Sequence, residues 1–499
     1  MTITTDATSL VPASVHATIS ALDPGHGQHL DGDGLAAVDG RTFAVLDKAT
    51  GAHLATFADG GAPEAIAAVD AAAAAFPAWA ATPPRQRSDA LHGAFALMTE
   101  RREELAALIS AENGKSLTDA RAEVGYAAEF FRWFAEEAVR PEGGYAESPN
   151  GGTRTIVTSR PVGVAALVTP WNFPAAMATR KIGSALAAGC TVVLKPATET
   201  PLTALAVARI LEEAGVPAGV VNVVTGTDPG AIVGTWLADA RVRKISFTGS
   251  TGVGRLLLGQ AAERVVNSSM ELGGNAPFVV AADADIEAAV AGAMIAKFRN
   301  GGQACTAANR FYVHADVAAE FVARFGAAIE DLVVGSPFDE ATTIGPMISA
   351  KAVGNLTSLV DDAIARGARI SHRAPSTTLA GHFYPPTLLT DVPPDAEVVR
   401  TEAFGPVAPV VTWSDEADLL RQVNDTELGL ASYVYSRDLR WALRLAERIE
   451  AGMVGINRGV VSDPAAPFGG VKQSGLGREG AREGVRAFTE TQYFSVDWT

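Results

Sequence analysis

The segment GGQACTAANR, residues 301–310, contains Cys305, one of two cysteines in a chain of 499 residues. The thiolate is the reactive form of cysteine, and a free thiol with a pKa of about 8.5 is only slightly ionised at neutral pH. Catalysis by Cys305 would therefore need helix N-terminal amides, a cation or a base beside the sulfur. By itself, a cysteine in a glycine-rich loop is more often buried and inert. Cys190 opens the apolar segment CTVVLKP and is predicted to be a packing residue.

Six other short motifs stand in order along the chain around the Cys305 loop. They are TPWNFP (169–174), LKPATETP (194–201), FTGST (247–251), MELGGNAP (270–277), EAFGPV (402–407) and PFGGVKQSGLGREG (467–480). Each is weak alone, and a single glycine-rich loop indicates almost nothing. Together with GQAC (302–305), the ordered set resembles the aldehyde dehydrogenase superfamily from roughly residue 45 to the C-terminus.

The resemblance implies a covalent mechanism centred on Cys305. Its sulfur would attack the aldehyde carbon, and the thiohemiacetal could then give up hydride to become a thioester that water cleaves. Asn172 and the Cys305 backbone N–H would stabilise the oxyanion, and Glu271 would activate the water. In isolation, Asn172 is typical of a turn and Glu271 of a surface charge at a strand end. Lys181 and Glu479 match positions sometimes assigned to proton relay, with ordinary ion pairing as the alternative.

The same resemblance implies a nicotinamide cofactor. Lys195 and Glu402 match residues that hold ribose hydroxyls, and Phe404 matches one that packs near the nicotinamide. A carboxylate at position 198 would repel the 2′-phosphate of NADP, but this chain has Thr198, so NADP is predicted, with NAD as the alternative. Glu199 complicates this inference, because its side chain could turn inward. The remaining predicted cofactor residues are Thr169, Pro170, Trp171, Pro196, Ala197, Phe247, Gly249, Ser250, Thr251 and Leu272.

Three residues near the motifs depart from generic members of the superfamily. Arg180, Arg299 and Ser462 resemble the carboxylate-binding residues of succinate-semialdehyde dehydrogenases. A hydrogen bond to a charged group contributes about 1.5–3 kcal/mol, so two arginines could select an aldehyde with a distal carboxylate. Succinic semialdehyde is the predicted substrate, and glutarate semialdehyde, one methylene longer, is its nearest rival. The alternative is that both arginines are structural ion-pair partners. Ala307 stands where some relatives carry a second cysteine, so no disulfide switch is expected.

Other function classes fit the sequence less well. A thiol esterase would want a histidine base, and all eight histidines lie outside the motifs, although side esterase activity is compatible with an acyl-enzyme. A CoA-acylating dehydrogenase is disfavoured by Glu271, which favours water as the acyl acceptor. An inactive structural or binding protein on the same scaffold is disfavoured by the intact Cys305, Glu271 and Asn172.

Composition limits the partners and the compartment. The formal charge of −16 argues against nucleic acid, because phosphate binding needs a basic surface. We found neither an apolar run of the roughly 20 residues that a membrane helix needs nor a signal-peptide pattern, so no membrane association is expected. Two distant cysteines indicate a reducing cytoplasm rather than a disulfide framework. No metal site is predicted.

The region from 162 to 272 must position these motifs. Its Val/Ile runs (GVAALVTP, CTVVLKP, GVVNVVTG and VRKISFTG) alternate with helical stretches predicted to begin at Pro174, Pro201, Gly230 and Ser250. This alternation predicts a parallel sheet with crossover helices, whose ligands bind beyond the carboxyl ends of the strands. Thr200 and Pro201 read as an N-cap and first-turn pair.

Two earlier segments have helical periodicity. Ile66, Val69, Ala73, Phe76 and Trp79 form an apolar stripe on a helix predicted from Pro63. A further helix is expected around REELAALISAENGKS, ending at Gly114. Residues 1–40 are predicted to be a loosely structured lead-in.

The predicted fold class is α/β and aldehyde dehydrogenase-like. It comprises a Rossmann-type cofactor-binding domain (1–140 and 162–269), an α/β catalytic domain (270–484, with segments that return to the cofactor domain) and a β-arm (141–161 and 485–499). The arm is predicted to pair with another subunit in a homodimer or homotetramer, and an internal edge strand is the alternative.

Overall fold

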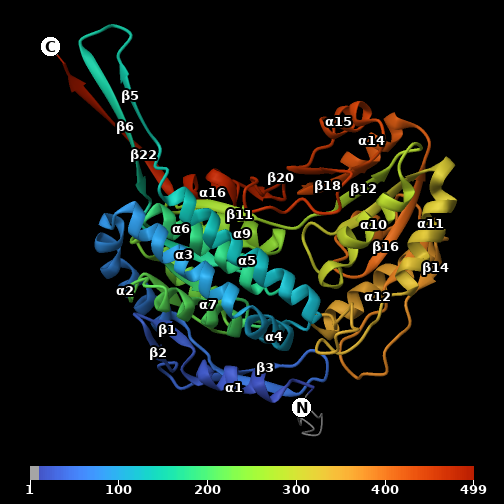
Figure 1. The fold of residues 1–499 in the computed structure, drawn as a ribbon, viewed down its shortest axis with the longest axis horizontal. Helices are drawn as coiled ribbons and strands as arrows, with labels where there is room; N and C mark the ends of the chain where they lie inside the picture. The colour runs from blue at the N-terminus through green and yellow to red at the C-terminus, as the bar shows by residue number, and fades with distance from the viewer. Residues whose placement is uncertain (1–9, 499) are drawn as a thin grey trace.

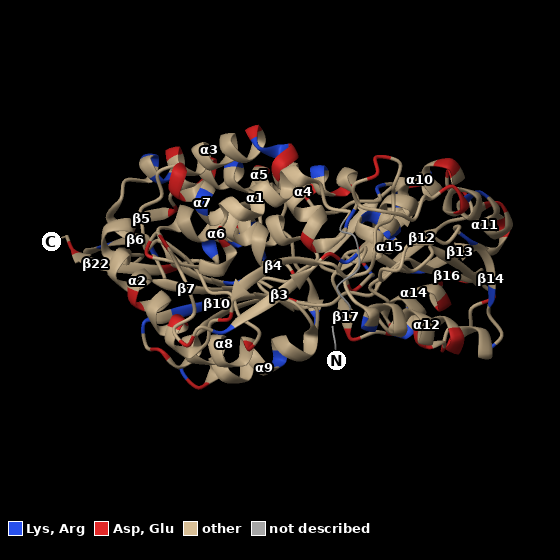
Figure 2. Ribbon diagram, turned by 90° about the horizontal axis from the view of Figure 1, so that it is seen from below, with Lys and Arg blue, Asp and Glu red and all other residues tan. Residues whose placement is uncertain are grey.

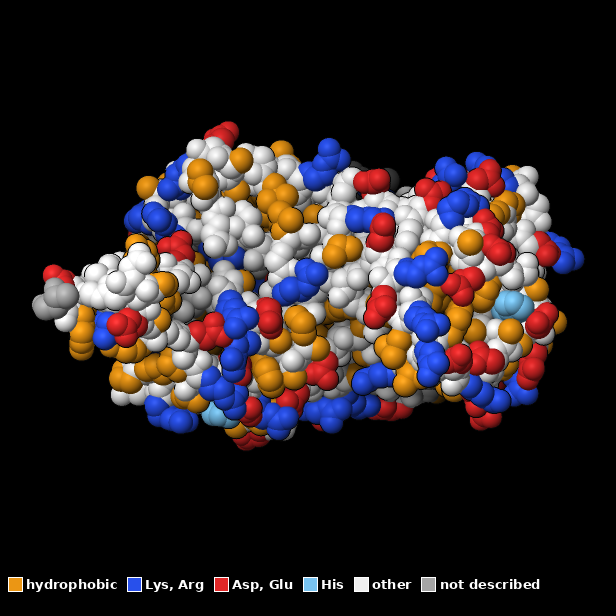
Figure 3. All heavy atoms as spheres, turned by 90° about the horizontal axis from the view of Figure 1, so that it is seen from above, with side chains coloured by type: hydrophobic (Ala, Val, Ile, Leu, Met, Phe, Trp, Pro, Cys, Tyr) orange, Lys and Arg blue, Asp and Glu red, His pale blue; other side chains and the backbone are white. Residues whose placement is uncertain are grey.

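A computed structural model describes residues 10–498 of the chain. Two α/β lobes lie side by side, and a β-arm projects from the one that contains the N-terminal half (Figure 1). Charged residues lie mainly on the outer helices and loops of both lobes, whereas the central strands carry few (Figure 2). On the face in Figure 3, acidic and basic side chains are interspersed.

An eight-stranded sheet forms the centre of the first lobe. Its order is β2 (Asp33–Leu35), β1 (Gln28–Leu30), β9 (Val221–Val223), β8 (Thr191–Lys195), β7 (Val164–Val168), β10 (Val242–Thr248), β11 (Asn267–Glu271) and β21 (Gly475–Leu476). The five strands from β9 to β11 are mutually parallel, as the Val/Ile runs predict. β1 and β21 pair antiparallel at the two sides of this parallel block.

The crossover helices begin where the sequence predicts, within one residue. They are α6 (Pro174–Ala188), α7 (Pro201–Glu213), α8 (Pro229–Ala238) and α9 (Thr251–Ala262, with Ser250 as N-cap). The capping role predicted for Thr200 is wrong, because its side chain makes no capping hydrogen bond. The Glu112 carboxylate instead accepts from the N–H groups of Leu202 and Thr203, at 2.8 and 2.9 Å. Glu112 lies on α4 (Arg102–Asn113), which ends before Gly114 as predicted.

The described part of the predicted lead-in, residues 10–40, is ordered, so that prediction is wrong there; residues 1–9 lie outside the described chain. It forms α1 (Ala13–Ala21), a 3-10 turn at Pro24–His26 and strands β1 and β2. The Gln28 side chain is fully buried and donates to the carbonyls of Ala58 and Thr225 at 3.2 and 3.0 Å. These distant partners fix β1 onto the sheet.

Helix α2 (Ala62–Ala81) lies where predicted, but its buried face differs from the predicted stripe. Val69 and Trp79 are buried, whereas Ile66 is 47% exposed. Small alanines dominate the buried face because α2 packs closely against β8 and α8. α2 is the one helix among residues 10–498 that is long and apolar enough to resemble a membrane span, but this packing makes it a helix of the fold.

A seven-stranded sheet forms the centre of the second lobe. Its order is β14 (Arg369–Arg373), β15 (Thr387–Thr390), β16 (Val407–Trp413), β13 (Ala308–His314), β12 (Ala276–Val280), β18 (Ala431–Tyr435) and β19 (Met453–Ile456). All are parallel to their neighbours except β14. The larger helices of this lobe are α10 (Ile286–Phe298), α11 (Ala315–Glu330), α12 (Ala350–Ala365), α14 (Glu416–Asn424) and α15 (Leu439–Ala446).

The remaining elements complete the two lobes, the connections between them and the arm. They are β3 (Thr42–Leu46), β4 (His53–Ala58), α3 (Pro84–Glu100), α5 (Leu117–Ala138), α13 (Glu397–Arg400), β17 (Leu428–Gly429), β20 (Val471–Lys472) and α16 (Ala481–Arg486). The arm consists of β5 (Gly143–Glu147), β6 (Thr153–Pro161) and β22 (Thr489–Asp497), in the antiparallel order β22-β6-β5. β22 therefore finds a partner more than 300 residues away in the sequence. Tyr145 and Tyr493 on the arm are 63% and 67% exposed.

Candidate active site

A cavity of about 250 Å³ lies at the carboxyl ends of β7, β10 and β11 and contains the Cys305 side chain in its wall. A cleft of about 540 Å³ adjoins it through three shared residues, Trp171, Glu402 and Phe404. The other residues of the cavity wall are Pro170, Asn172, Phe173, Met177, Thr248, Gly249, Ser250, Leu272 and Gly273. Residues from five of the seven motifs thus surround one space, as a parallel sheet predicts.

The loop that carries Cys305 has an unusual backbone. Asn300, Gly301 and Gly302 all have positive φ, at 53°, 60° and 75°. Cys305 then sits in a turn closed by the 2.9 Å hydrogen bond from Ala307 N–H to the Ala304 carbonyl. No residue within 10–498 accepts a hydrogen bond from the Cys305 N–H, so that donor remains available.

Gly274 allows the Cys305 turn to pack against the loop after β11. A Cβ at this position would overlap the carbonyl oxygen of Cys305. We expect Gly274→Ala to displace Cys305, reducing kcat by at least tenfold and lowering Tm, because backbone cannot yield as a flexible side chain can. Gly234→Ala on α8 is the matched control, since its Cβ would meet nothing within 4 Å. Equal kcat in the two variants would show that this close contact does not position the thiol.

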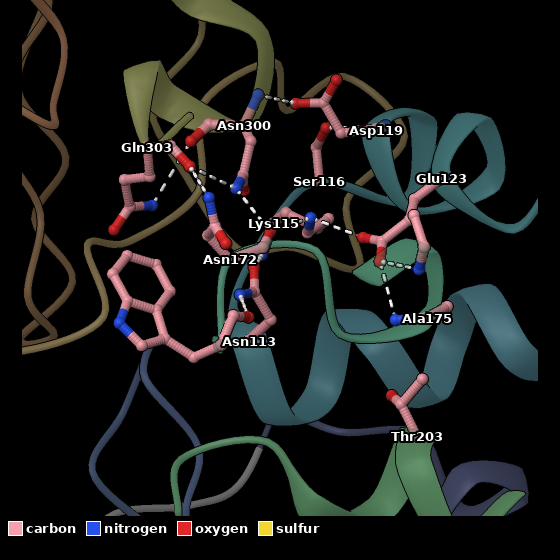
Figure 4. A network of polar contacts seen from close by, with 12 residues as sticks. Asn113, Lys115, Ser116, Asp119, Glu123, Asn172, Ala175, Thr203, Asn300 and Gln303 are labelled. Carbon is pink, nitrogen blue, oxygen red and sulfur yellow. Dashed lines mark hydrogen bonds and ion pairs between the residues drawn. The ribbon is translucent and has the colours of Figure 1, made fainter. Parts of the chain in front are cut away.

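Asn172 lies in the loop between β7 and α6, with its side-chain amide directed towards the Cys305 loop. Its Nδ2 donates to the Gln303 carbonyl at 3.0 Å, which leaves its second N–H for another acceptor. The Asn172 carbonyl accepts hydrogen bonds from Asn300 Nδ2 at 2.8 Å and from Lys115 Nζ at 2.7 Å (Figure 4). Both the backbone and the amide of Asn172 are therefore fixed before any substrate binds.

A buried ion pair supports this loop from behind. Lys115 Nζ lies 2.6 Å from Glu123 Oε2, and both side chains are fully buried. The other Glu123 oxygen accepts from the Ala175 N–H at 2.9 Å, at the first turn of α6 (Figure 4). Because breaking such a pair leaves an uncompensated buried charge, the pair has one stable arrangement.

Glu271, the last residue of β11, is 2% exposed. Neither of its carboxyl oxygens has a hydrogen-bond partner among residues 10–498. Burial, followed by the charge of Glu479, raises the pKa of Glu271 well above its usual value. Burial also raises the pKa of the Cys305 thiol to about 12, although Arg180 opposes the shift. The thiol and the carboxyl are close enough for the Glu271 charge to contribute to the Cys305 shift.

Arg180 and Lys181, neighbours on α6, share the carboxylate of Glu479. Arg180 Nε lies 2.7 Å from Glu479 Oε2, and Lys181 Nζ contacts Glu479 Oε1 and donates to Ser246 Oγ at 2.8 Å. Burial acts against the Arg180 charge, but Glu479, Tyr126 and Glu271 outweigh it and raise the pKa of the guanidinium. Arg180 therefore forms the ion pair that was the alternative prediction, through its Nε atom, whereas its Nη1 atom has no hydrogen-bond partner among residues 10–498.

Arg299 and Ser462 are half-buried, and both lie close enough to the Tyr126 hydroxyl to lower its pKa, as Arg180 does. The Arg299 guanidinium lies 5.3 Å from the centre of the Phe173 ring, which lines the cavity. Its positive charge opposes the rise in the pKa of Cys305, as that of Arg180 does. The structure therefore brings both arginines to the nucleophile.

The predicted cofactor residues divide into two groups. Glu402, Phe404 and Trp171 lie between the cavity and the larger cleft, with the Trp171 and Phe404 rings in edge contact at 5.5 Å. Glu402 Oε1 accepts from the Gly274 N–H at 3.1 Å, and a Cβ at Gly273 would stand 2.7 Å from Glu402 Oε2. The glycine therefore makes room for this carboxylate. Burial raises the pKa of Glu402 to about 7.

The second group lies at the end of β8 and outside the walls of both cavities. Lys195 Nζ donates to the Pro196 carbonyl at 3.0 Å and to Thr198 Oγ1 at 3.3 Å. Burial lowers the pKa of Lys195 to about 8, while Glu199 and Asp59 act in the opposite direction. The Glu199 side chain is exposed and does not turn inward. Thr169 and Ala197 lie in the same strand-end region, and Phe247 and Thr251 flank the glycine-rich loop.

Several residues of the site were missed by the sequence reasoning, namely Lys115, Asp119, Glu123, Tyr126, Asn300 and Gln303. Gln303 lies inside the GQAC motif, and its side chain gives the glutamine a physical reason. Its Oε1 accepts from the Ile348 N–H at 3.0 Å, and its Nε2 donates to the Asn300 carbonyl at 3.3 Å. Asn300 lies in the Cys305 loop, where its positive φ suits asparagine, whereas the other four carry no local signal because they meet the site through contacts with distant segments.

The two α/β lobes thus bring a partly buried thiol, a fixed amide and an unpaired carboxylate to the end of a parallel sheet, and this fold and site are those of an oxidoreductase. The chain belongs to the aldehyde dehydrogenase family, whose model, "Aldehyde dehydrogenase family", matches residues 36–494. It is therefore an enzyme that oxidises aldehydes with NAD or NADP.

Individual relatives cover nearly the whole chain. A succinate-semialdehyde dehydrogenase of Paenarthrobacter nicotinovorans is 52% identical over 89% of this chain and 98% of its own. A glutarate-semialdehyde dehydrogenase of Pseudomonas putida is 46% identical over 94% of this chain and 97% of its own. A solved structure described as an E. coli NADP-dependent enzyme has a TM-score of 0.93 and 47% identity, covering 94% and 98% of the two chains.

Proposed function

We propose that the protein oxidises an aldehyde with a distal carboxylate, succinic semialdehyde above all, to the acid with NADP. The observation that carries the proposal is the position of Arg180 and Arg299, two cations whose charges both reach Cys305 in a protein of net charge −16. An anionic substrate needs such local attraction against the overall field. The names of the relatives from P. nicotinovorans and P. putida agree with a semialdehyde substrate.

Each catalytic residue has one task in this proposal. Cys305 Sγ bonds to the aldehyde carbon after losing its proton, and the oxyanion that forms accepts hydrogen bonds from the Asn172 amide and the Cys305 N–H. Bound NADP supplies a hydride acceptor, which leaves a thioester on Cys305. Glu271 then takes a proton from water as the water oxygen attacks the thioester, and the carboxylic acid leaves as Sγ is restored. Lys181 and Glu479 form an ion pair that could pass the Glu271 proton onwards.

The residues present fit a dinucleotide. Glu402 and Lys195 would hold the two riboses, and Phe404 with Trp171 would bound the nicotinamide ring. Gly249 and Ser250 bring the chain to the start of α9, where unpaired N–H groups favour phosphate. At position 198 a neutral hydroxyl donates to the Gly226 carbonyl at 3.0 Å, so no carboxylate stands there against a 2′-phosphate.

Thr198→Glu tests the cofactor preference. We expect kcat/KM with NADP to fall at least tenfold relative to NAD, since a carboxylate repels the 2′-phosphate and accepts from a 2′-hydroxyl. Steady-state kinetics with both cofactors measure the ratio, and Glu199→Gln, at the exposed neighbouring side chain, is the control. An unchanged ratio in Thr198→Glu would place this residue away from the adenosine ribose.

The direct test of the function is the formation of reduced cofactor from succinic semialdehyde, glutarate semialdehyde and butanal. We expect kcat/KM to be highest for succinic semialdehyde. Since one methylene changes binding by only about 1–3 kcal/mol, glutarate semialdehyde should be a poorer but real substrate. Equal kcat/KM for butanal would contradict selection of a carboxylate.

Arg299→Gln tests the carboxylate contact with the least structural damage, because Arg180 also neutralises Glu479. We expect kcat/KM for succinic semialdehyde to fall about 10- to 100-fold, which corresponds to one charged hydrogen bond. The loss should appear mainly in KM, and butanal turnover is the internal control. If both substrates lost activity equally, Arg299 would be a structural residue.

The remaining parts of the proposal concern assembly and setting. The cofactor unit would comprise residues 1–140 and 162–269, the catalytic unit 270–484, and the arm 141–161 with 485–499. Exposed aromatic residues along the arm, including Tyr145, Tyr493 and Phe494, suit pairing with a second copy in a dimer or tetramer. A reducing cytoplasm suits a mechanism that needs the free thiol of Cys305.

A further inference from the structure

One face of helix α5 (Leu117–Ala138) is directed at the active site. Asp119, Glu123, Tyr126 and Phe130 recur at the spacing that places residues on one side of a helix. Asp119 accepts from the Asn300 N–H at 2.8 Å, and Glu123 holds the first turn of α6. The helix is thus attached both to the loop of Cys305 and to the loop of Asn172.

Phe130 and Tyr126 continue this face towards Arg180. The Phe130 ring centre lies 5.8 Å from the Arg180 guanidinium, and the Tyr126 and Phe130 rings meet edge-on at 4.8 Å. The edge-on contact with Phe130 orients the Tyr126 ring. Its hydroxyl is consequently positioned by the fold rather than by its own flexibility.

The Tyr126 hydroxyl is buried but makes no hydrogen bond of good geometry with any residue in 10–498. Burial raises the pKa of this phenol, while the charges of Arg180 and Arg299 and a loose hydrogen-bond contact with the Ser462 side chain act on it in the opposite direction. These are the three residues predicted to bind the substrate carboxylate, and Cys305 also contributes to the shift. Buried tyrosine hydroxyls normally make a well-formed hydrogen bond, and here only the loose contact with Ser462 is present, so the hydroxyl can donate to an acceptor that the substrate brings.

A second donor in the same place is also unpaired. Arg180 Nη1 is buried without a hydrogen-bond partner among the described residues. Two orphaned donors beside a further cation call for an anionic acceptor, and a carboxylate offers about four acceptor positions on two oxygens. A water molecule would satisfy the donors but not the charge.

We propose that Tyr126 is a specificity-determining residue whose hydroxyl donates a hydrogen bond to the distal carboxylate of the substrate, beside Arg180 and Arg299. This inference rests on the proposed function and extends it, because it assigns substrate contact to a residue outside every motif. When an uncharged aldehyde occupies the site, the buried Tyr126 hydroxyl has no well-placed acceptor for its hydrogen bond. This desolvation cost lowers the affinity for uncharged aldehydes relative to carboxylated ones.

Tyr126→Phe removes only this oxygen and keeps the ring that packs on Phe130. We expect kcat/KM for succinic semialdehyde to fall about tenfold, chiefly through KM, since one hydrogen bond to a charged group is lost. kcat/KM for butanal should stay the same or rise. The inhibition constant of succinate, the product, should rise by a similar factor. Tyr145→Phe, on the exposed arm, is the matched control and should leave all three values unchanged.

The outcomes separate the inference from the function. If the wild-type enzyme showed no preference for succinic semialdehyde over butanal, the proposed function would fail and the inference with it. If the wild type kept its preference and Tyr126→Phe left that preference and succinate inhibition unchanged, the inference alone would fail. Equal losses with both aldehydes would make Tyr126 a packing residue and would also overturn it. A thermal melt shows whether Tyr126→Phe is folded like the wild type.

Discussion

Cys305→Ser is expected to lower kcat for aldehyde oxidation by about 10⁴-fold or more, the scale seen when a covalent nucleophile is removed. A serine hydroxyl is a far weaker acid than a thiol, and the surroundings of Cys305 already disfavour a negative charge, as its raised pKa of about 12 indicates. The near-isosteric replacement should leave Tm almost unchanged. Stopped-flow and steady-state assays of reduced cofactor measure the loss.

Cys190→Ser is the matched control for this substitution. Cys190 is fully buried and belongs to the core of the first lobe, away from the walls of the Cys305 cavity. Its replacement should lower stability, because burying a hydroxyl costs desolvation free energy. It should leave kcat within a factor of about three, because Cys190 does not line the Cys305 cavity. Substantial turnover in Cys305→Ser, or an acyl adduct on another residue after trapping and mass spectrometry, would contradict the covalent role.

Those parts of the fold that depend on local patterns could be predicted from the sequence. Pro174 and Pro201 mark helix starts because proline fixes φ and needs no hydrogen-bond acceptor in the first turn. Gly114 marks a helix end because it adopts φ of 94°, which other residues avoid. The Val/Ile runs become buried parallel strands for a similarly local reason.

Features decided by distant contacts could not be predicted. Gln28 orders the segment around it only because Ala58 and Thr225 offer carbonyls there. Glu112 replaces Thr200 as the cap of α7 from 90 positions away. Ile66 fits a helical stripe, but the sheet beneath α2 admits the small alanines on the adjoining face instead.

The same distinction applies to the active site. The sequence motifs identify Cys305, Glu271 and Asn172. The loops of Cys305 and Asn172 are also held by residues outside the motifs, on α5 and in the segment between α4 and α5. Lys115 and Glu123 are eight positions apart, a spacing that predicts no pairing on a helix, yet they form a fully buried ion pair behind Asn172. The physical role of these residues depends on which segment packs against α5, and that is a property of the fold.

Glu271→Gln should block the second half of the reaction. Without a base, the thioester on Cys305 forms but is cleaved slowly, so we expect a burst of about one reduced cofactor per site followed by turnover lowered about 10²- to 10⁴-fold. Rapid-mixing kinetics distinguish this burst from a uniform loss of rate. Absence of a burst would mean that Glu271 acts before or during hydride loss rather than on the attacking water.

The pH profile gives a second measure of the same residue. Burial and Glu479 raise the pKa of Glu271, and a general base must be unprotonated, so kcat should increase as pH rises through a range well above that of an ordinary carboxyl. Glu479→Gln removes the neighbouring negative charge and leaves Arg180 and Lys181 positive. Both changes favour the ionised form of Glu271, so the rising limb should move to lower pH. A limb that persists unchanged in Glu271→Gln would assign it to another group, and a limb that moves to higher pH in Glu479→Gln would reverse the electrostatic order inferred for this site.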